Sequence, residues 1–171
     1  SESIFKENLF EGKKVFITGG ATGMGLGFAK AFLEHGADVL IASRKEENLS
    51  KAASEIKDQT GKTLHWKMMD VRNYETVEEV AKHIKDTWGY LDVLVNNAAG
   101  NFVTPAAAMS ENAWRAVIDI VLDGTFRVSK ACYPLLRNNK EGSSIVNIIA
   151  NYAWGAAPFV AHSGAAKAGV L

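Results

Sequence analysis

The stretch Lys14–Gly25, KVFITGGATGMG, joins a short apolar run to a glycine-rich loop at the start of a helical pattern. The run Lys14–Thr18 is typical of a strand that is buried on both faces of a parallel sheet. Four glycines fall between positions 19 and 25, and a backbone without side chains lets a phosphate group approach closely. The helix that follows would direct its free N–H groups at that phosphate. The stretch therefore predicts a phosphate-binding turn after the first strand of an α/β sheet.

The spacing of these glycines, TGxxxGxG, differs from the two best-known phosphate-loop patterns. It is not the GxGxxG of the general dinucleotide fingerprint, and it lacks the Lys-Ser or Lys-Thr pair of a P-loop. The alternative is a flexible turn between strand and helix that binds no ligand. We expect the loop to hold the phosphates of a dinucleotide through Thr18, Gly19, Gly20, Thr22, Gly23, Met24 and Gly25.

The rest of the chain repeats the alternation of apolar runs with helical patterns. Further strands are predicted over 38–43, 64–69, 91–95 and 144–149, and helices over about 25–35, 46–60, 74–88, 110–137 and 164–171. Strands that are apolar along their whole length and alternate with helices form parallel sheets covered on both faces. Because crossovers are right-handed, such a sheet is doubly wound and binds ligands at the carboxyl ends of its strands. We predict one α/β domain over residues 1–171.

The composition argues against several classes of function. The 171 residues include 19 basic and 19 acidic side chains, so no basic stripe favours nucleic acid, and no run of about twenty apolar residues predicts a membrane span. The single cysteine, Cys132, suits a reducing compartment, and the N-terminus lacks a signal-peptide core, so we expect a cytoplasmic protein. The four histidines are scattered without ligand spacing, so we expect no metal site.

The end of the second predicted strand indicates which dinucleotide would bind. An acidic residue there would hold the ribose 2′-hydroxyl of NAD, but the sequence has Ser43, Arg44 and Lys45. A guanidinium can bind a 2′-phosphate through two parallel N–H bonds, so the sequence favours NADP(H). The alternative is that Arg44 and Lys45 are ordinary solvated side chains. Asp70 and Val71, at the end of the third strand, are expected to flank the adenine.

The closing stretch Asn147–Lys167, NIIANYAWGAAPFVAHSGAAK, carries a tyrosine, a serine and a lysine that could form one proton-transfer site. Lys167 follows Ser163 by four residues, which places both side chains on one face of a helix. Tyr152 is expected in the loop before that helix. A nearby ammonium favours the phenolate form of a tyrosine and so makes the phenol a better proton donor. The alternatives are a half-buried ring at Tyr152 and a helix N-cap at Ser163.

The segments TGGATGMG, LDVLVNNAAGNF and the closing stretch together resemble the short-chain dehydrogenase/reductase family, over essentially the whole chain. The resemblance implies a Rossmann-type doubly wound parallel sheet that binds NADP(H). The segment Asn96–Gly100 looks like the NNAG element of that family, which steadies the sheet beside the cofactor. The resemblance therefore adds Asn97, Ala98 and Ala99 to the expected cofactor site.

The sequence departs from the family at the positions that usually carry the chemistry. Ser163 stands at the usual tyrosine position, and Ala150 at the usual serine position. Val121 stands where an asparagine is often found in the long helix. An ordinary site for reducing ketones is therefore not expected.

The departures themselves, with Tyr152 two residues after Ala150 and Gly100-Asn101-Phe102 after the NNAA, are similar to the 2,4-dienoyl-CoA reductases of the short-chain type. The runs YAWGA and VAHSGAAKAGVL look like the bacterial, Bacillus-type members. The resemblance implies reduction of 2,4-dienoyl-CoA to 3-enoyl-CoA by NADPH in fatty acid beta-oxidation.

The same resemblance implies roles for four residues. Asn101 and Tyr152 would stabilise negative charge on the thioester oxygen, with Ser163 supporting their orientation. Tyr152 would then give a proton to Cα, and Lys167 would hold the hydroxyls of the nicotinamide ribose. The alternative for Asn101 is a turn residue.

Members of this family usually continue for a further strand or two and a substrate-binding segment, and they are commonly tetrameric. The resemblance thus implies that the C-terminal part of the usual fold is absent from residues 1–171. It also implies a homo-oligomer that acts on an acyl-CoA thioester, with no nucleic acid or membrane partner. Trp154 and Phe159 either wall an acyl pocket or belong to an aromatic core. Two other functions stay open: a related reductase acting on a carbonyl or a 2-enoyl thioester, or a non-catalytic NADP(H)-binding sensor or assembly subunit.

Overall fold

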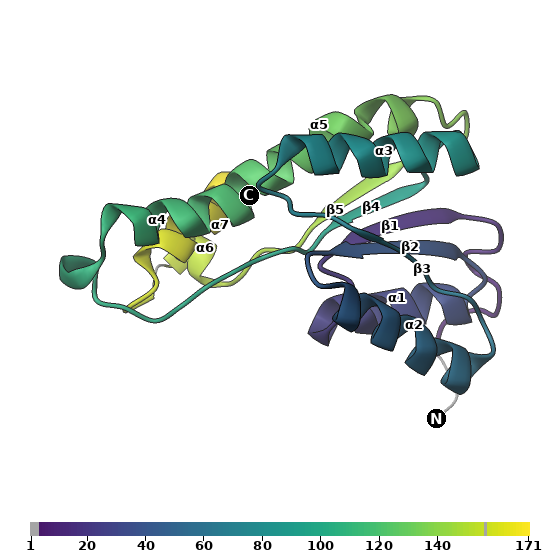
Figure 1. Cartoon of the computed structure of the whole chain (residues 1–171), viewed down its shortest axis with the longest axis horizontal. Helices are drawn as coiled ribbons and strands as arrows, with labels where there is room; N and C mark the ends of the chain where they lie inside the picture. The colour runs from purple at the N-terminus through teal and green to yellow at the C-terminus, as the bar shows by residue number, and fades with distance from the viewer. Residues whose placement is uncertain (1–3, 156) are drawn as a thin grey trace.

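The computed structural model describes residues 4–155 and 157–171 and contains one sheet of five parallel strands (Figure 1). The strands are β1 (Lys14–Thr18), β2 (Asp38–Ser43), β3 (His65–Met68), β4 (Val93–Asn96) and β5 (Ser144–Asn147). They lie in the order β3-β2-β1-β4-β5, and each neighbouring pair is parallel. The chain runs outward from β1 to one edge and then to the other, so the predicted doubly wound sheet is confirmed.

Helices cover both faces of this sheet. Helices α1 (Gly23–Glu34) and α2 (Glu46–Thr60) lie on one face, and α3 (Tyr74–Trp88) and α5 (Gly124–Arg137) on the other (Figure 1). The remaining elements are the 3₁₀ turn η1 (Ala106–Ala108), α4 (Glu111–Ile118), the π-helical segment η2 (Asp119–Asp123), α6 (Tyr152–Gly155) and α7 (Ala161–Val170).

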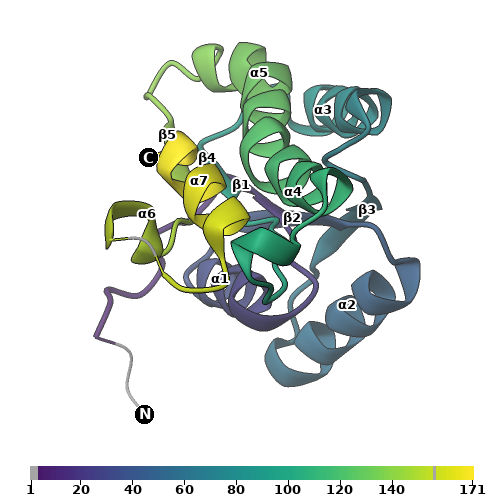
Figure 2. The ribbon, with the colours of Figure 1, turned by 90° about the vertical axis from the view of Figure 1, so that its left-hand side faces the viewer.

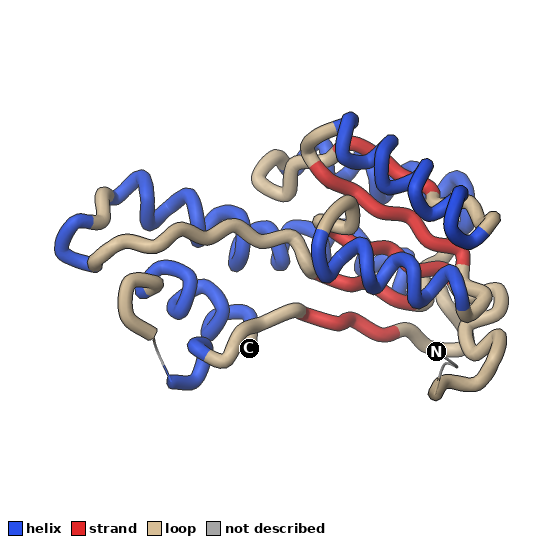
Figure 3. The backbone as a smooth tube through the Cα atoms, turned by 90° about the horizontal axis from the view of Figure 1, so that it is seen from below, coloured by secondary structure: helices blue, strands red, loops and turns tan. Residues whose placement is uncertain are grey.

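Helices α4, α6 and α7 extend past the carboxyl ends of the strands (Figure 3). Helix α7 packs beside α4 and η2 there (Figure 2). Residues from the end of β5 onward are thereby brought next to the helix that follows β4.

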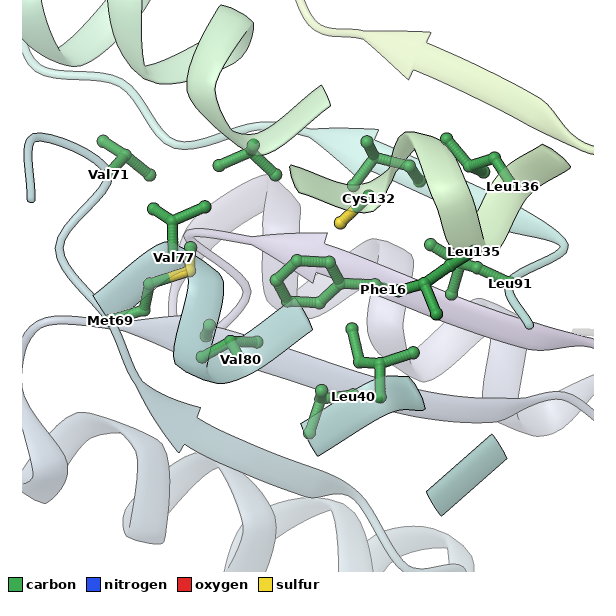
Figure 4. Close-up of a cluster of buried hydrophobic side chains, with 14 residues drawn as sticks. Phe16, Leu40, Met69, Val71, Val77, Val80, Leu91, Cys132, Leu135 and Leu136 are labelled. Carbon is green, nitrogen blue, oxygen red and sulfur yellow. The ribbon is translucent and has the colours of Figure 1, made fainter. Parts of the chain in front are cut away.

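The two faces of the sheet carry separate hydrophobic cores. On β1, Phe16 belongs to the core under α3 and α5, whereas Val15 and Ile17 belong to the core under α1 and α2. Successive strand residues point to opposite faces, so one strand supplies both cores. Figure 4 shows Phe16 inside the first cluster with Cys132 and Leu135 of α5 nearby. Burying a phenylalanine contributes about 1.5–3 kcal/mol to the free energy of folding. Because the strands are parallel and packed on both faces, their carboxyl ends are held together at the same end of the sheet.

Cys132 offers a direct test of this packing. Its side chain is 1% exposed, and burial raises the pKa of its thiol to about 12. Because the thiolate is the reactive form, we expect iodoacetamide at about pH 8 to label the folded protein roughly a thousandfold more slowly than the unfolded protein. Mass spectrometry of samples quenched over time, with and without denaturant, measures both rates. Equal rates would show that α5 does not enclose this side chain.

The last third of the chain differs from prediction at four places, the first being that β5 ends at Asn147, two residues before its predicted end. The helix predicted over 110–137 begins as expected, since Ser110 Oγ accepts a hydrogen bond from the N–H of Ala113 at 3.1 Å, but η2 interrupts it. Tyr152 begins the short helix α6 and does not lie in a loop, so that prediction was wrong. Helix α7 begins at Ala161, which places Ser163 inside the helix and excludes it as the N-cap.

Candidate active site

A pocket of about 330 Å³ opens at the carboxyl ends of β1, β2, β3 and β4. Of the residues expected at a dinucleotide, Gly19, Thr22, Met24, Gly25, Ser43, Arg44, Asp70, Val71, Asn97, Ala98 and Ala99 line it. It is also lined by Gly100, the last residue of the NNAG-like segment, and by Ala42, Met69 and Ile120, which were not expected at the dinucleotide. The volume lies within the range of small-molecule sites, about 300–1,000 Å³. The position is the one at which open α/β sheets bind ligands.

The glycine loop packs so closely against the end of β4 and against itself that side chains would not fit there. A Cβ on Gly25 would lie 2.4 Å from the carbonyl oxygen of Gly19 and 2.6 Å from Nδ2 of Asn97. Gly19 has a φ of +65°, and a Cβ on it would lie 3.0 Å from Cα of Ala98. Helix α1 begins at Gly23, directly after this loop, so its unpaired N–H groups and the positive end of its dipole lie at the pocket. These residues fit the phosphates of a dinucleotide.

Thr18 and Gly20 support the loop without lining the pocket. Thr18 Oγ1 accepts hydrogen bonds from the backbone N–H groups of Asn97 at 3.0 Å and Ala98 at 2.9 Å. The side-chain amide of Asn97 donates in turn to the carbonyl oxygen of Thr18 at 3.0 Å. A Cβ on Gly20 would lie 2.4 Å from Cγ2 of Ile41 on β2. These contacts join the ends of β1, β2 and β4, as expected for the Asn-Asn segment.

Charged groups lie at the side of the pocket formed by β2 and β3. Arg44 is exposed and, within the part of the chain that the structure describes, makes no hydrogen bond or ion pair. Its guanidinium is therefore free to bind an anion. Asp70 Oδ2 lies 2.5 Å from Nη2 of Arg72. Hydrogen bonds from Arg72 lower the pKa of Asp70, and the positive charge of Arg44 adds to this effect. Lys45 is exposed at the N-cap position of α2 and does not line the pocket.

Tyr152, Ser163 and Lys167 come together past the carboxyl end of β5. The hydroxyl oxygens of Tyr152 and Ser163 are 3.1 Å apart. The ammonium of Lys167 donates to the carbonyl oxygen of Ile148, and burial lowers the pKa of Lys167. Ser163 and Lys167 share the buried side of α7, with 1% and 7% of their surfaces exposed. Tyr152 and Ser163 thus contact each other, Lys167 lies one turn further along α7, and none of the three lines the pocket described above.

Asn101 stands apart from this group in the structure. It directly follows the pocket-lining segment 97–100, and its side chain is exposed. Its Oδ1 accepts a hydrogen bond from the N–H of Phe102 at 2.9 Å. No hydrogen bond joins Asn101 to Tyr152 in the described part of the chain. In this structure the side chain of Asn101 thus bonds to the backbone of the residue that follows it.

The segment η2 separates the pocket from α7. Ile120 lines the pocket, whereas Val121 packs against Ala166 of α7. Gly124 follows η2, and a Cβ there would lie 2.8 Å from Cγ2 of Val71. π-Helical turns occur frequently at functional sites. In this one, Ile120 contacts the pocket and the next residue, Val121, contacts α7. Ile120 was not predicted to line the pocket, because the apolar pattern of a helix does not show where a π-helical turn will interrupt it.

Among residues 4–155 and 157–171, no helix is both long enough and apolar enough to cross a membrane. No three histidine, cysteine, aspartate or glutamate side chains gather there as a set of metal ligands.

Comparison with known proteins agrees with this geometry. The family model for short chain dehydrogenases matches residues 13–171. A Bacillus subtilis protein named as a probable 2,4-dienoyl-CoA reductase that produces a (2E)-enoyl-CoA is 44% identical over 161 residues, 94% of this chain and 63% of that protein. A peroxisomal 2,4-dienoyl-CoA reductase of Danio rerio, named as producing a (3E)-enoyl-CoA, is 39% identical over 96% of this chain and 55% of that protein. The chain thus spans between about half and two thirds of these relatives.

Solved structures show the same arrangement of elements. A short chain dehydrogenase from Bacillus anthracis superposes with a TM-score of 0.84 at 46% identity, covering 92% of this chain and 65% of that one. A short chain dehydrogenase from Shigella flexneri, solved in complex with NADP, superposes with a TM-score of 0.91 at 26% identity, covering 96% of this chain and 70% of that one.

Proposed function

Because this chain belongs to the short-chain dehydrogenase/reductase family, we propose that the protein reduces 2,4-dienoyl-CoA thioesters with NADPH in the degradation of unsaturated fatty acids. The observation that carries the proposal is the contact of 3.1 Å between the hydroxyls of Tyr152 and Ser163, one helical turn from Lys167. It supplies a phenol on the hydroxyl of the serine that holds the usual tyrosine position, on the same helix as the lysine. The names of the relatives from B. subtilis and D. rerio support the substrate class.

Residues of the pocket, together with Lys167 outside it, would bind the parts of NADPH. The segment 19–25 and the N-terminus of α1 would bind its pyrophosphate, and Arg44 its 2′-phosphate. Asp70 and Val71 would flank the adenine, and Lys167 would bind the nicotinamide ribose. When bound, NADPH supplies the hydride that the dienoyl group accepts at Cδ.

The residues of the chain would stabilise the resulting charge and deliver a proton. Hydride addition at Cδ moves an electron pair through the diene to the thioester oxygen and forms a dienolate. A donor placed at that oxygen stabilises the transition state more than the ground state, and Tyr152 is the donor that we propose, together with Asn101. Ser163 would hold the phenol in place. Transfer of the phenolic proton to carbon completes the reduction, and solvent returns a proton to Tyr152.

The carbon that receives the proton decides the product. A proton at Cα leaves the double bond between Cβ and Cγ, which gives a 3-enoyl-CoA, whereas a proton at Cγ gives a 2-enoyl-CoA. The D. rerio relative is named for the first product and the B. subtilis relative for the second. We propose the 3-enoyl product because a phenol bound at the thioester oxygen is closest to Cα. Proton NMR of product formed in deuterated water distinguishes the two by the carbon that carries deuterium.

The preference for NADPH is expected to depend on Arg44. Replacing it with alanine should weaken NADPH binding about ten- to a hundredfold, because a hydrogen-bonded charge pair contributes about 1.5–3 kcal/mol. Affinity for NADH, which lacks the 2′-phosphate, should change less than about twofold. Titration of the nicotinamide fluorescence measures both affinities.

A neighbouring cation provides the control for this measurement. Lys45→Ala also removes one positive charge, but from outside the pocket, so a loss of less than about threefold is expected. If the unmodified protein bound NADPH and NADH equally well, the choice of NADP(H) would be wrong.

A further inference from the structure

Arg127 on α5 bonds to two separate segments beside the dinucleotide pocket without lining the pocket itself. Its Nη1 donates to a carboxylate oxygen of Asp119 at 2.6 Å and to the backbone carbonyl oxygen of the same residue at 3.3 Å. The same nitrogen donates to the carbonyl oxygen of Val71 at 3.4 Å. Asp119 begins η2, and Val71 belongs to the loop between β3 and α3. One guanidinium therefore joins two segments that are far apart in the sequence.

Both of these segments line the pocket. Asp70 and Val71 line it from the loop after β3, and Ile120 lines it from η2, one residue after Asp119. The two segments also pack closely, since a Cβ on Gly124, directly after η2, would lie 2.8 Å from Cγ2 of Val71. The position of one segment relative to the other therefore sets the shape of this part of the pocket.

The segment η2 contains an irregular turn that its neighbours must hold. The N–H of Gly124 donates to the carbonyl oxygen of Asp119, five residues earlier, as in a π-helix, which is rare in proteins. Thr125 Oγ1 donates to the carbonyl oxygen of Val121 at 2.7 Å. Two side chains from the first turn of α5, those of Thr125 and Arg127, thus bond to carbonyl groups of η2.

The loop after β3 is shaped by its own hydrogen bonds but is joined to η2 through Arg127. The N–H of Asn73 donates to the carbonyl oxygen of Asp70 at 2.9 Å, and the N–H of Asp70 donates to Thr76 Oγ1 at 3.2 Å. These bonds are local and do not reach η2. Among the residues that the structure describes, Arg127 makes the only hydrogen bond between this loop and η2 or α5.

We propose that Arg127 is a positioning residue for the adenosine half of NADPH. This inference rests on the proposed function and adds to it a residue that bonds to the protein and not to the cofactor. By holding Val71 against η2, the guanidinium keeps the adenine site formed before the cofactor arrives. A protein whose binding-competent state is only partly populated binds with an affinity that is lowered by that fraction. Loss of Arg127 therefore weakens binding of the adenosine half and leaves the chemical step unchanged.

The test replaces Arg127 with methionine, which removes the donors and keeps an unbranched stem. Calorimetric titration with adenosine 2′,5′-bisphosphate, which carries the adenine and the 2′-phosphate but no nicotinamide, measures the adenosine site alone. We expect the affinity for this probe to fall about tenfold, the effect of losing one hydrogen bond from a charged group. In the natural protein that contains this chain, the KM for NADPH should rise by the same factor, with kcat at saturating NADPH kept within about twofold.

Two further variants make the test specific. Arg115→Met is the matched control, because Arg115 also forms an ion pair on a helix, with Glu111 at 3.1 Å, and does not line the pocket. It should change the affinity for the bisphosphate less than about twofold. Arg127→Lys serves if the methionine variant unfolds, since its shorter side chain keeps the charge near Asp119 but ends short of the carbonyl of Val71. It should still weaken the bisphosphate by at least about threefold.

The outcomes separate this inference from the proposed function. Weaker binding of the bisphosphate with kcat retained supports the inference. Unchanged binding overturns it, and so does a fall in kcat as large as the rise in KM, which would mean that Arg127 supports the fold of α5 in general. A bisphosphate that does not bind the unmodified protein overturns it as well. If the unmodified protein binds the bisphosphate but oxidises NADPH with no 2,4-dienoyl thioester, the proposed function fails, while the titrations still decide the role of Arg127.

Discussion

Replacing Tyr152 with phenylalanine is expected to lower turnover of a 2,4-dienoyl-CoA by at least about a hundredfold, the usual cost of losing one donor to a developing oxyanion. The variant keeps the ring and its packing but loses the hydroxyl that lies 3.1 Å from Ser163 Oγ. It therefore loses both the proposed donor to the thioester oxygen and the proposed source of the proton for Cα. Binding of NADPH should change little, since Tyr152 does not line the pocket proposed for the dinucleotide.

The rate of NADPH oxidation with saturating thioester measures this effect. Tyr133→Phe is a matched control, because Tyr133 lies on α5, is 57% exposed and has no part in the proposed chemistry. A Tyr152→Phe variant that is as fast as the unmodified protein would remove the mechanism while leaving the fold intact.

The second large effect is expected at the glycine loop. Gly25→Ala should weaken NADPH binding by at least about a hundredfold, because the new methyl group has no room. It would lie 2.4 Å from the carbonyl oxygen of Gly19 and 2.6 Å from Nδ2 of Asn97. The loop must shift to admit it, and each N–H that no longer reaches a phosphate loses about 1.5–3 kcal/mol.

Gly27 provides the control for this substitution. It lies two residues further along α1, and nothing comes within 4 Å of a Cβ built there. Gly27→Ala should retain NADPH affinity and raise the free energy of unfolding by about 0.5–1 kcal/mol, since alanine favours the helix. Thermal unfolding with and without NADPH reports both quantities. If Gly25→Ala bound NADPH with the same affinity as Gly27→Ala, the glycine loop would not be the phosphate-binding site.

The sheet and much of the pocket could be predicted from the sequence because both depend on local patterns. The segments Lys14–Thr18, Asp38–Ser43, Glu46–Thr60 and Tyr74–Trp88 form elements with the predicted bounds. Most of the pocket residues were found because they lie at or soon after the carboxyl end of a strand in a parallel sheet. Leu64, Met69 and Leu91 were assigned to strands but lie outside them, although they are buried. Apolar character reports burial and does not by itself report pairing within the sheet.

The features that sequence reasoning missed depend on contacts between distant segments. The π-helical turn at Asp119–Asp123 lies between Val71 on one side and Ala166 on the other. The first turn of α7 extends back to Ala161, where packing buries His162 and Ser163. Neither has a local signature. The structure shows a contact between Tyr152 and Ser163. The catalytic roles of these two residues, and of Lys167 and Asn101, remain predictions.

One measurement tests the central claim most directly: the absorbance of NADPH is followed while the natural protein acts on 2,4-decadienoyl-CoA, and the product is identified. The account predicts that NADPH and thioester disappear in equal amounts and that 3-enoyl-CoA accumulates. A protein that leaves 2,4-decadienoyl-CoA intact while it reduces a ketone or a 2-enoyl thioester with NADPH would contradict it.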